Sequence, residues 1–108
     1  DLLINKIKGL SIPVKKLDRN HIYHLYTIKV EKEYQLSRDQ LFSKLAHKGI
    51  GTSVQYFPLH LMTLYKKDYK NKKNHFPNAN NLKDKILCLP IYPQMTDKEI
   101  TYVVSNLK

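Results

Sequence analysis

The sequence predicts a small α+β domain in which a three-stranded sheet is covered by amphipathic helices. Two capping boxes, beginning at Ser37 and at Thr96, each precede apolar residues at helical spacing. Two other segments, 21–30 and 87–92, are rich in β-branched, aromatic and other apolar residues, a composition typical of strands. With 108 residues the chain can bury one core but is too short for a two-domain enzyme.

The beginning of the chain is predicted to be the end of a helix, followed by a linker that reaches Asn20. Gly9 suits the left-handed position after a helix, and Pro13 follows shortly afterwards. The apolar residues of this helix would share one face, and they are Leu3, Ile7 and Leu10. Residues 21–30 are then predicted to form the first strand. Its alternate apolar residues would point to one side, and they are Ile22, Tyr26, Ile28 and Val30.

A helix is predicted from Ser37 to about Lys48. The Ser37 hydroxyl can accept a hydrogen bond from the Gln40 amide, and the Gln40 side chain can return one to Ser37. Gly49 follows as the expected left-handed residue after the last turn. The apolar face of this helix would consist of Leu41, Phe42, Leu45 and Ala46. The next residues, 50–57, are predicted to form a second strand, which Pro58 would end.

The last third of the chain is predicted to contain a loop, two helices and one more strand. Residues 66–78 combine charges and asparagines without an apolar period, which predicts a solvated loop. A helix should run from Pro77 to about Lys85, and a buried strand should cover 87–92, closed by Pro93. The final helix would follow Thr96 and bury Ile100, Val103, Val104 and Leu107.

The chain is strongly basic, but lysine carries nearly all of the charge. The formal net charge is +10, and only Arg19 and Arg38 are arginines. Arginine reads guanine edges and grips phosphates with its bidentate fork, whereas scattered lysines mostly solvate a surface. We interpret the charge as compositional bias. The alternative is a basic module that binds RNA or DNA through its sheet with Tyr23 and Tyr26, although their opposite strand parity disfavours a shared stacking platform.

The sequence indicates neither a membrane segment, nor a disulfide framework, nor a metal site. No apolar run approaches roughly 20 residues and no signal segment opens the chain, so we expect a soluble, cytoplasmic protein. The single cysteine, Cys88, lies in an apolar stretch and is expected to be buried. On a strand, His21 and His24 would point to opposite faces, which argues against a paired metal site and favours an internal hydrogen-bonding role for His24.

Four groups of short sequences occur in order along the chain. They are HIYHLY at 21–26, KGIG at 48–51 with YFPLH at 56–60, FPNA at 76–79, and LPIYP at 89–93 followed by Thr96 and Asp97. Together they resemble the carboxy-terminal small domain of the DegT/DnrJ/EryC1/StrS family of sugar-nucleotide aminotransferases, which depend on pyridoxal phosphate (PLP). The resemblance implies that residues 1–20 are the end of an interdomain helix and a linker. Residues 21–108 would form the small domain, without the large PLP-binding domain.

The resemblance implies a fold-type I PLP enzyme that works as a homodimer. Its reaction would be amino transfer, usually from glutamate, to a keto carbon of a nucleotide-linked deoxysugar, in the synthesis of a polysaccharide or glycan. The lysine that binds PLP belongs to the family's large domain, so none of the lysines here corresponds to it. We therefore assign no catalytic residue and no cofactor to this chain, and expect it to be inactive alone.

The resemblance also suggests which residues border the substrate cleft. Tyr56 and His60 would bind the sugar nucleotide, together with Gln55, which stands where the family often has histidine. Since glutamine carries no charge near neutral pH, Gln55 suits binding better than proton transfer. In the structural alternative, Tyr56 caps the sheet edge and His60 makes an internal hydrogen bond in a proline-containing turn. A third interpretation is a purely structural dimerisation domain.

Two further features of the sequence are assigned to structure in preference to ligand binding. The segment 49–51 has two glycines but follows a helix, the reverse of the order that aims amides at a phosphate. The lysines between 66 and 73, interleaved with Tyr65 and Tyr69, could attract a diphosphate, but a solvated loop is the preferred interpretation.

Overall fold

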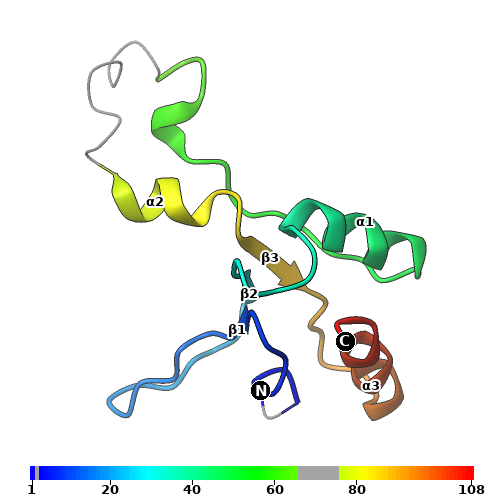
Figure 1. Ribbon diagram of the computed structural model, residues 1–108. Coiled ribbons are helices and arrows are strands. Elements are labelled where there is room, and N and C mark those ends of the chain that lie inside the picture. Colours follow the sequence, from blue (N-terminus) through cyan, green and yellow to red (C-terminus); the bar gives the residue numbers. More distant parts are fainter. Residues whose placement is uncertain (2, 66–75) are drawn as a thin grey trace.

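The computed structural model describes residues 1, 3–65 and 76–108. Within these residues the strands are β1 (Leu10–Ser11), β2 (Tyr26–Val30) and β3 (Ile86–Leu89), and the helices are α1 (Arg38–His47), the 3-10 helix η1 (Leu59–Leu61), α2 (Pro77–Leu82) and α3 (Asp97–Asn106). In Figure 1, β3 lies between α2, which leads into it, and α3, which follows it. The described part thus has the expected architecture, a small three-stranded sheet with helices around it.

The sheet is antiparallel, and β2 is its central strand. Leu10 of β1 pairs with Val30, and Ile28 pairs with Leu87 of β3. Alternate side chains of β2 and β3 enter the core, where Ile28 and Leu87 are fully shielded from solvent. The alternation predicted for 26–30 is therefore confirmed.

The core joins the sheet to α1 and α3. Leu41 and Leu45 of α1 are fully buried against it, and so is Leu107 just after α3. The Tyr34 hydroxyl donates to the Leu107 carbonyl over 2.6 Å, and burial raises the pKa of Tyr34. This bond ties the end of the chain to the loop between β2 and α1.

Both predicted capping boxes are present. Ser37 and Gln40 exchange hydrogen bonds at the start of α1, and Thr96 and Glu99 do the same at the start of α3. The buried faces are narrower than expected, because Phe42, Ala46 and Ile100 are exposed. On α1 the buried apolar residues, Leu41 and Leu45, are four apart, so a single row of side chains meets the sheet.

The first residues do not form the predicted helix. Residues 3–6 are turns, although the Asn5 amide donates to the Asp1 carbonyl with the span of an α-helical bond. A single helical turn is costly to form unless further turns follow it. The expected linker also contains β1, since the carbonyl of Gly9 and the residues after it pair with the end of β2. That residues 1–20 end an interdomain helix stays a prediction.

The first predicted strand is shorter than 21–30. Tyr23 has a φ of +50°, and its amide donates to Nδ1 of His21 over 2.8 Å, so the chain turns there instead of continuing the strand. Ile22 is 88% exposed, not buried as its place in the alternation predicted. His24 is exposed as well, which corrects the expected internal role.

The second predicted strand, 50–57, is absent from the described structure apart from one bridge. Ser53 exchanges two backbone hydrogen bonds with Cys88 at the free edge of β3. The pairing does not extend in either direction. On one side Pro90 has no amide to donate, and on the other the Ile86 carbonyl already accepts from the side chain of Arg38. The third strand of the sheet is β1 instead.

The last two boundaries also differ from the prediction. Helix α2 ends at Leu82 instead of Lys85, and β3 ends at Leu89 instead of Tyr92, because its last partner is Tyr26, where β2 begins. Cys88 is buried as expected. Most of the predicted loop 66–78 lies outside the described residues, and its end, from Pro77, is helical. Among the described helices, none has the length and apolar character required to cross a membrane.

Candidate functional site

The predicted substrate residues lie on the segment 53–60, which leaves the edge of β3. Its first residue, Ser53, is fixed by the backbone bridge to Cys88. The side chain of Gln55 is half-buried, and its Nε2 donates to the Ser53 hydroxyl over 3.3 Å. Gln55 is therefore held close to the sheet.

Tyr56 is directed outward. Its side chain is 73% exposed, and the next apolar residues, Phe57 and Leu59, are 54% and 63% exposed. Such exposure does not fit the alternative in which the Tyr56 ring covers the sheet edge. The Tyr56 phenol, which can both donate and accept hydrogen bonds, is free of the core and accessible to a ligand.

His60 lies inside the fold, in η1. It is 8% exposed, its Nε2 lies 2.9 Å from Oδ1 of Asn80 on α2, and its ring stacks on Phe76 with a centroid distance of 4.7 Å. Since an amide oxygen only accepts hydrogen bonds, Nε2 carries the proton of this pair. The geometry favours the structural alternative for His60, which links the end of the segment 53–60 to α2.

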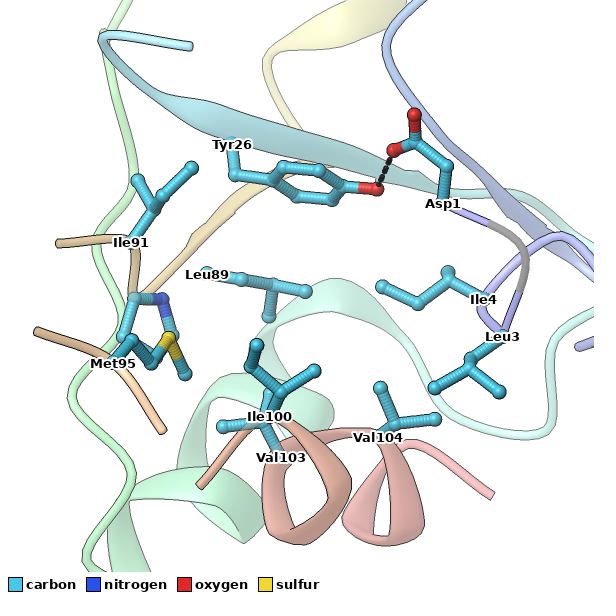
Figure 2. A pocket seen from close by; sticks show the side chains of 11 residues that line it. Asp1, Leu3, Ile4, Tyr26, Leu89, Ile91, Met95, Ile100, Val103 and Val104 are labelled. Atoms are coloured by element: carbon cyan, nitrogen blue, oxygen red, sulfur yellow. Dashed lines mark hydrogen bonds between the residues drawn. The ribbon is translucent and has the colours of Figure 1, made fainter. Parts of the chain in front are cut away.

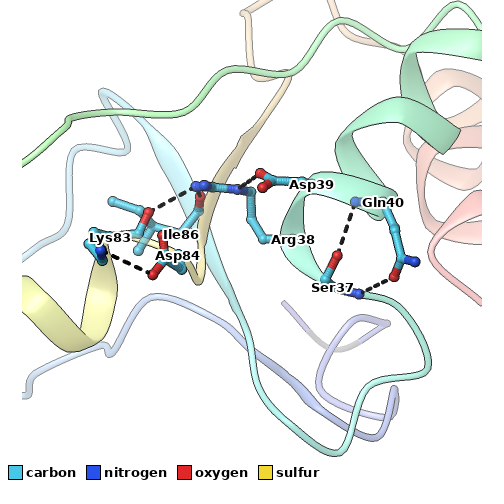
Figure 3. A network of polar contacts seen from close by, with 7 residues as sticks. All are labelled: Ser37, Arg38, Asp39, Gln40, Lys83, Asp84 and Ile86. Carbon is cyan, nitrogen blue, oxygen red and sulfur yellow. Dashed lines mark hydrogen bonds and ion pairs between the residues drawn. The ribbon is translucent and has the colours of Figure 1, made fainter.

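Arg38, at the start of α1, was not predicted as part of the site. Figure 3 shows its guanidinium between α1 and the turn that joins α2 to β3. Nη1 donates to the carbonyls of Lys83 and Ile86, each over 3.1 Å, and Nε donates to Asp39. No local pattern in the sequence indicates this role, because the carbonyl partners of Arg38 lie more than forty positions away.

An apolar pocket lies on another part of the surface, beside α3 (Figure 2). Its volume is about 200 Å³, and its lining includes Ile4, Leu89, Met95 and Val104. Polar groups enter only at its rim, where the Tyr26 hydroxyl donates to the Asp1 carboxylate. A pocket with so few polar groups is unsuited to a hydroxyl-rich sugar nucleotide.

Tyr23 and Tyr26 correct the expectation that they point to opposite faces. Their rings stack with centroids 5.9 Å apart, because the turn at Tyr23 breaks the strand alternation. Both hydroxyls donate to Asp1, and burial is the main cause that raises the pKa of Tyr26. One face of each ring is thus covered by the other ring, and both hydroxyls are bonded to Asp1.

The sequence also singled out the lysine-rich loop and the question of a metal site. The lysine cluster and Tyr69 lie outside the described residues. Among the residues that the structure does describe, no group of three or more His, Cys, Asp or Glu side chains could hold a metal ion.

With this geometry established, the sequence can be compared with known proteins. The model of the DegT/DnrJ/EryC1/StrS aminotransferase family matches residues 2–108. The chain belongs to this family. Among curated members, it is similar to the spore coat polysaccharide biosynthesis protein SpsC of Bacillus subtilis, with 35% identity over 105 residues. It is also similar to the dTDP-4-amino-4,6-dideoxy-D-glucose transaminase of Escherichia coli, with 26% identity over 106 residues.

The chain corresponds to only part of these aminotransferases. The matched regions cover 95% and 97% of this chain, but 27% and 29% of the two relatives. Thus the chain spans somewhat more than a quarter of the length of these curated relatives, and it matches their carboxy-terminal part.

Solved aminotransferases share the fold. DesV from S. venezuelae, solved in complex with a ketimine intermediate, is 27% identical with a TM-score of 0.85 over 98% of this chain and 27% of its own. Spr1654 from Streptococcus pneumoniae, solved in a PLP form, is 27% identical with a TM-score of 0.76 over 93% of this chain and 26% of its own. The resemblance drawn from the four sequence groups is confirmed, together with the fold class.

Proposed function

We propose that this chain is the cleft-closing small domain of a PLP-dependent aminotransferase that aminates a nucleotide-linked keto-deoxysugar. The observation that carries the proposal is the family match over residues 2–108. The names of the two curated relatives refer to polysaccharide biosynthesis and to a dTDP-linked amino sugar, which supports a nucleotide-sugar substrate. We further propose that the complete enzyme is a cytoplasmic homodimer.

PLP would be held outside this chain. The segment 49–51, which contains two of the three glycines, ends α1 with Gly49 at a φ of +71°. Its amides therefore do not form the phosphate site of a helix N-terminus. When bound to the remainder of the enzyme, PLP supplies the electron sink for amino transfer. We assign no part of the PLP site to the residues described here, and their proposed task is to bind the sugar nucleotide.

The segment 53–60 would present one side of the substrate cleft. The exposed Tyr56 phenol would exchange hydrogen bonds with hydroxyl or phosphate oxygens, and Gln55 would add an uncharged amide. Gln55 cannot act as an acid or base near neutral pH, so these groups bind and orient the sugar without moving protons. His60, buried against Asn80, would hold the segment in place instead of touching substrate.

The replacement Tyr56→Phe tests this proposal in the complete enzyme. We expect the KM for the sugar nucleotide to rise by about threefold to tenfold, because a hydrogen bond between uncharged groups contributes about 0.5–1.5 kcal/mol. The KM for the amino donor should stay unchanged. Steady-state kinetics with each substrate varied in turn provides the measurement.

Tyr102→Phe is the matched control. Tyr102 is half-exposed on α3, and its hydroxyl donates to the Lys48 carbonyl, so the same hydroxyl is removed away from the segment 53–60. The control should leave both KM values at the wild-type level. An unchanged KM for the sugar nucleotide in Tyr56→Phe would remove Tyr56 from the substrate site.

A further inference from the structure

Besides Tyr34, the buried side chains with polar groups in the described part of the chain include Arg38 and His60. Burying a guanidinium is costly unless its N–H groups are bonded. The Nη1 of Arg38 is bonded to the carbonyls of Lys83 and Ile86, and its Nε to the carboxylate of Asp39. The two carbonyls flank the turn between α2 and β3 (Figure 3), so one side chain fixes both ends of that turn.

The elements on both sides of the turn contact the segment 53–60. Upstream, α2 carries Asn80, whose Oδ1 lies 2.9 Å from Nε2 of His60. Downstream, β3 carries Cys88, which exchanges two backbone bonds with Ser53, and Ser53 in turn accepts from Gln55. A shift of the turn would therefore reach both Gln55 and His60, and with them the intervening Tyr56.

The opposite side of the turn is held independently of Arg38. The Val30 amide donates to the Lys85 carbonyl over 2.8 Å, and Nζ of Lys85 donates to Glu31 over 2.9 Å. The bond from Lys85 lowers the pKa of Glu31, so this carboxylate stays charged near neutral pH. Since β2 keeps the turn attached to the sheet, loss of Arg38 should displace the turn without unfolding the domain.

We propose that Arg38 is a positioning residue that sets the placement of Gln55, Tyr56 and His60 by fixing the turn between α2 and β3. Its role in substrate binding rests on the proposed function, whereas its effect on the position of the segment does not. The guanidinium also occupies the Ile86 carbonyl, the next acceptor that a longer pairing of 53–57 with β3 would need. Arg38 thus both ends that pairing and holds the strand from which the segment departs.

Two replacements of Arg38 separate its charge from its geometry. Arg38→Met keeps an unbranched stem but removes every donor. Arg38→Lys retains the charge and donors for the carbonyls, yet it lacks the planar fork that also reaches Asp39. The matched control is Arg19→Lys, because Arg19 is the other arginine of the chain, is exposed and pairs with the adjacent Asp18.

The first measurement is NMR on the 108-residue chain, with signals from the His60 ring and the side-chain amides of Gln55 and Asn80. We expect Arg38→Met to shift these signals while the core resonances of Ile28 and Leu87 stay in place. Arg38→Lys should give smaller shifts, and Arg19→Lys none. If Arg38→Met does not fold, Arg38→Lys provides the same comparison. Unchanged Gln55 and His60 signals in a folded Arg38 variant would overturn the inference.

The second measurement is kinetics of the complete enzyme. Arg38→Met should raise the KM for the sugar nucleotide on the order of tenfold, with a smaller effect on kcat and partial rescue in Arg38→Lys. If Tyr56→Phe raises this KM but neither Arg38 variant does, the positioning role is wrong and the proposed function stands. If neither Tyr56→Phe nor Arg38→Met changes it, the segment 53–60 does not bind the sugar nucleotide, and the role of Arg38 in substrate binding is overturned with it.

Discussion

Replacement of Gly9 by alanine is expected to destabilise the domain by about 3 kcal/mol, the sum of two separate costs. Gly9 has a φ of +81°, a left-handed conformation that costs other residues about 1–2 kcal/mol. A Cβ at this position would also lie 2.1 Å from the backbone nitrogen of Tyr34 and 2.5 Å from its Cα. Because these are backbone atoms, relief requires a shift of the loop before α1.

The other two glycines are matched controls for the two costs. Gly49 has a φ of +71°, but a Cβ added there would have no neighbouring atom within 4 Å, so Gly49→Ala should cost only about 1–2 kcal/mol. Gly51 has neither a left-handed φ nor a close neighbour, and Gly51→Ala should be almost neutral. Urea denaturation followed by circular dichroism measures all three. Equal losses for Gly9→Ala and Gly49→Ala would show that the contact with Tyr34 is not tight.

Replacement of Leu45 by alanine should cost about 3 kcal/mol, within the range of about 2–5 kcal/mol for buried leucines. Leu45 is fully shielded and belongs to the cluster that joins α1 to the sheet. Removing three carbon atoms there would lose the free energy of shielding that apolar surface from water. It would also leave a cavity that the strands on the other side cannot fill without moving.

The same change at Leu59 is the control, since Leu59 is 63% exposed in η1. Leu59→Ala should change the free energy of unfolding by less than about 0.5 kcal/mol. The assignment of the core is tested by the urea concentrations at which the two variants are half unfolded. The comparison is valid if the free energy of unfolding falls with urea at the same slope in both. Similar costs for Leu45→Ala and Leu59→Ala would contradict it.

The parts of the fold that could be predicted from sequence depend on local chemistry. The capping boxes at Ser37 and Thr96 and the left-handed Gly49 each involve residues within a few positions of one another. The alternation along Tyr26–Val30 likewise reports one strand with one buried face. Such local interactions do not depend on where distant residues of the chain lie, so the sequence alone can indicate them.

The parts that could not be predicted depend on distant partners. Residues 50–57 have the composition of a strand, but their pairing is limited by Pro90 and by the side chain of Arg38. Conversely, β1 has only two residues and no strand pattern of its own, and it exists because the end of β2 is available to pair with it. Neither fact can be read from the local sequence.

The candidate site shows the same division. The resemblance selected the segment that carries Gln55, Tyr56 and His60, and the chain belongs to the family that suggested it. Sequence could not separate the exposed Tyr56 from the buried His60, since both are polar aromatics near a proline. The partner of His60, Asn80, lies twenty positions away on α2. Arg38 was missed for the same reason, as its carbonyl partners lie on a turn more than forty positions further on.

The central claim is that this chain supplies the sugar-binding side of a cleft and leaves PLP chemistry to the remainder of the enzyme. The most direct test is the formation of amino sugar by the purified 108-residue chain, supplied with PLP, glutamate and a nucleotide-linked ketosugar. We predict no product above the rate without protein, and product only when the complete enzyme is used. Steady turnover by the chain alone would contradict the claim.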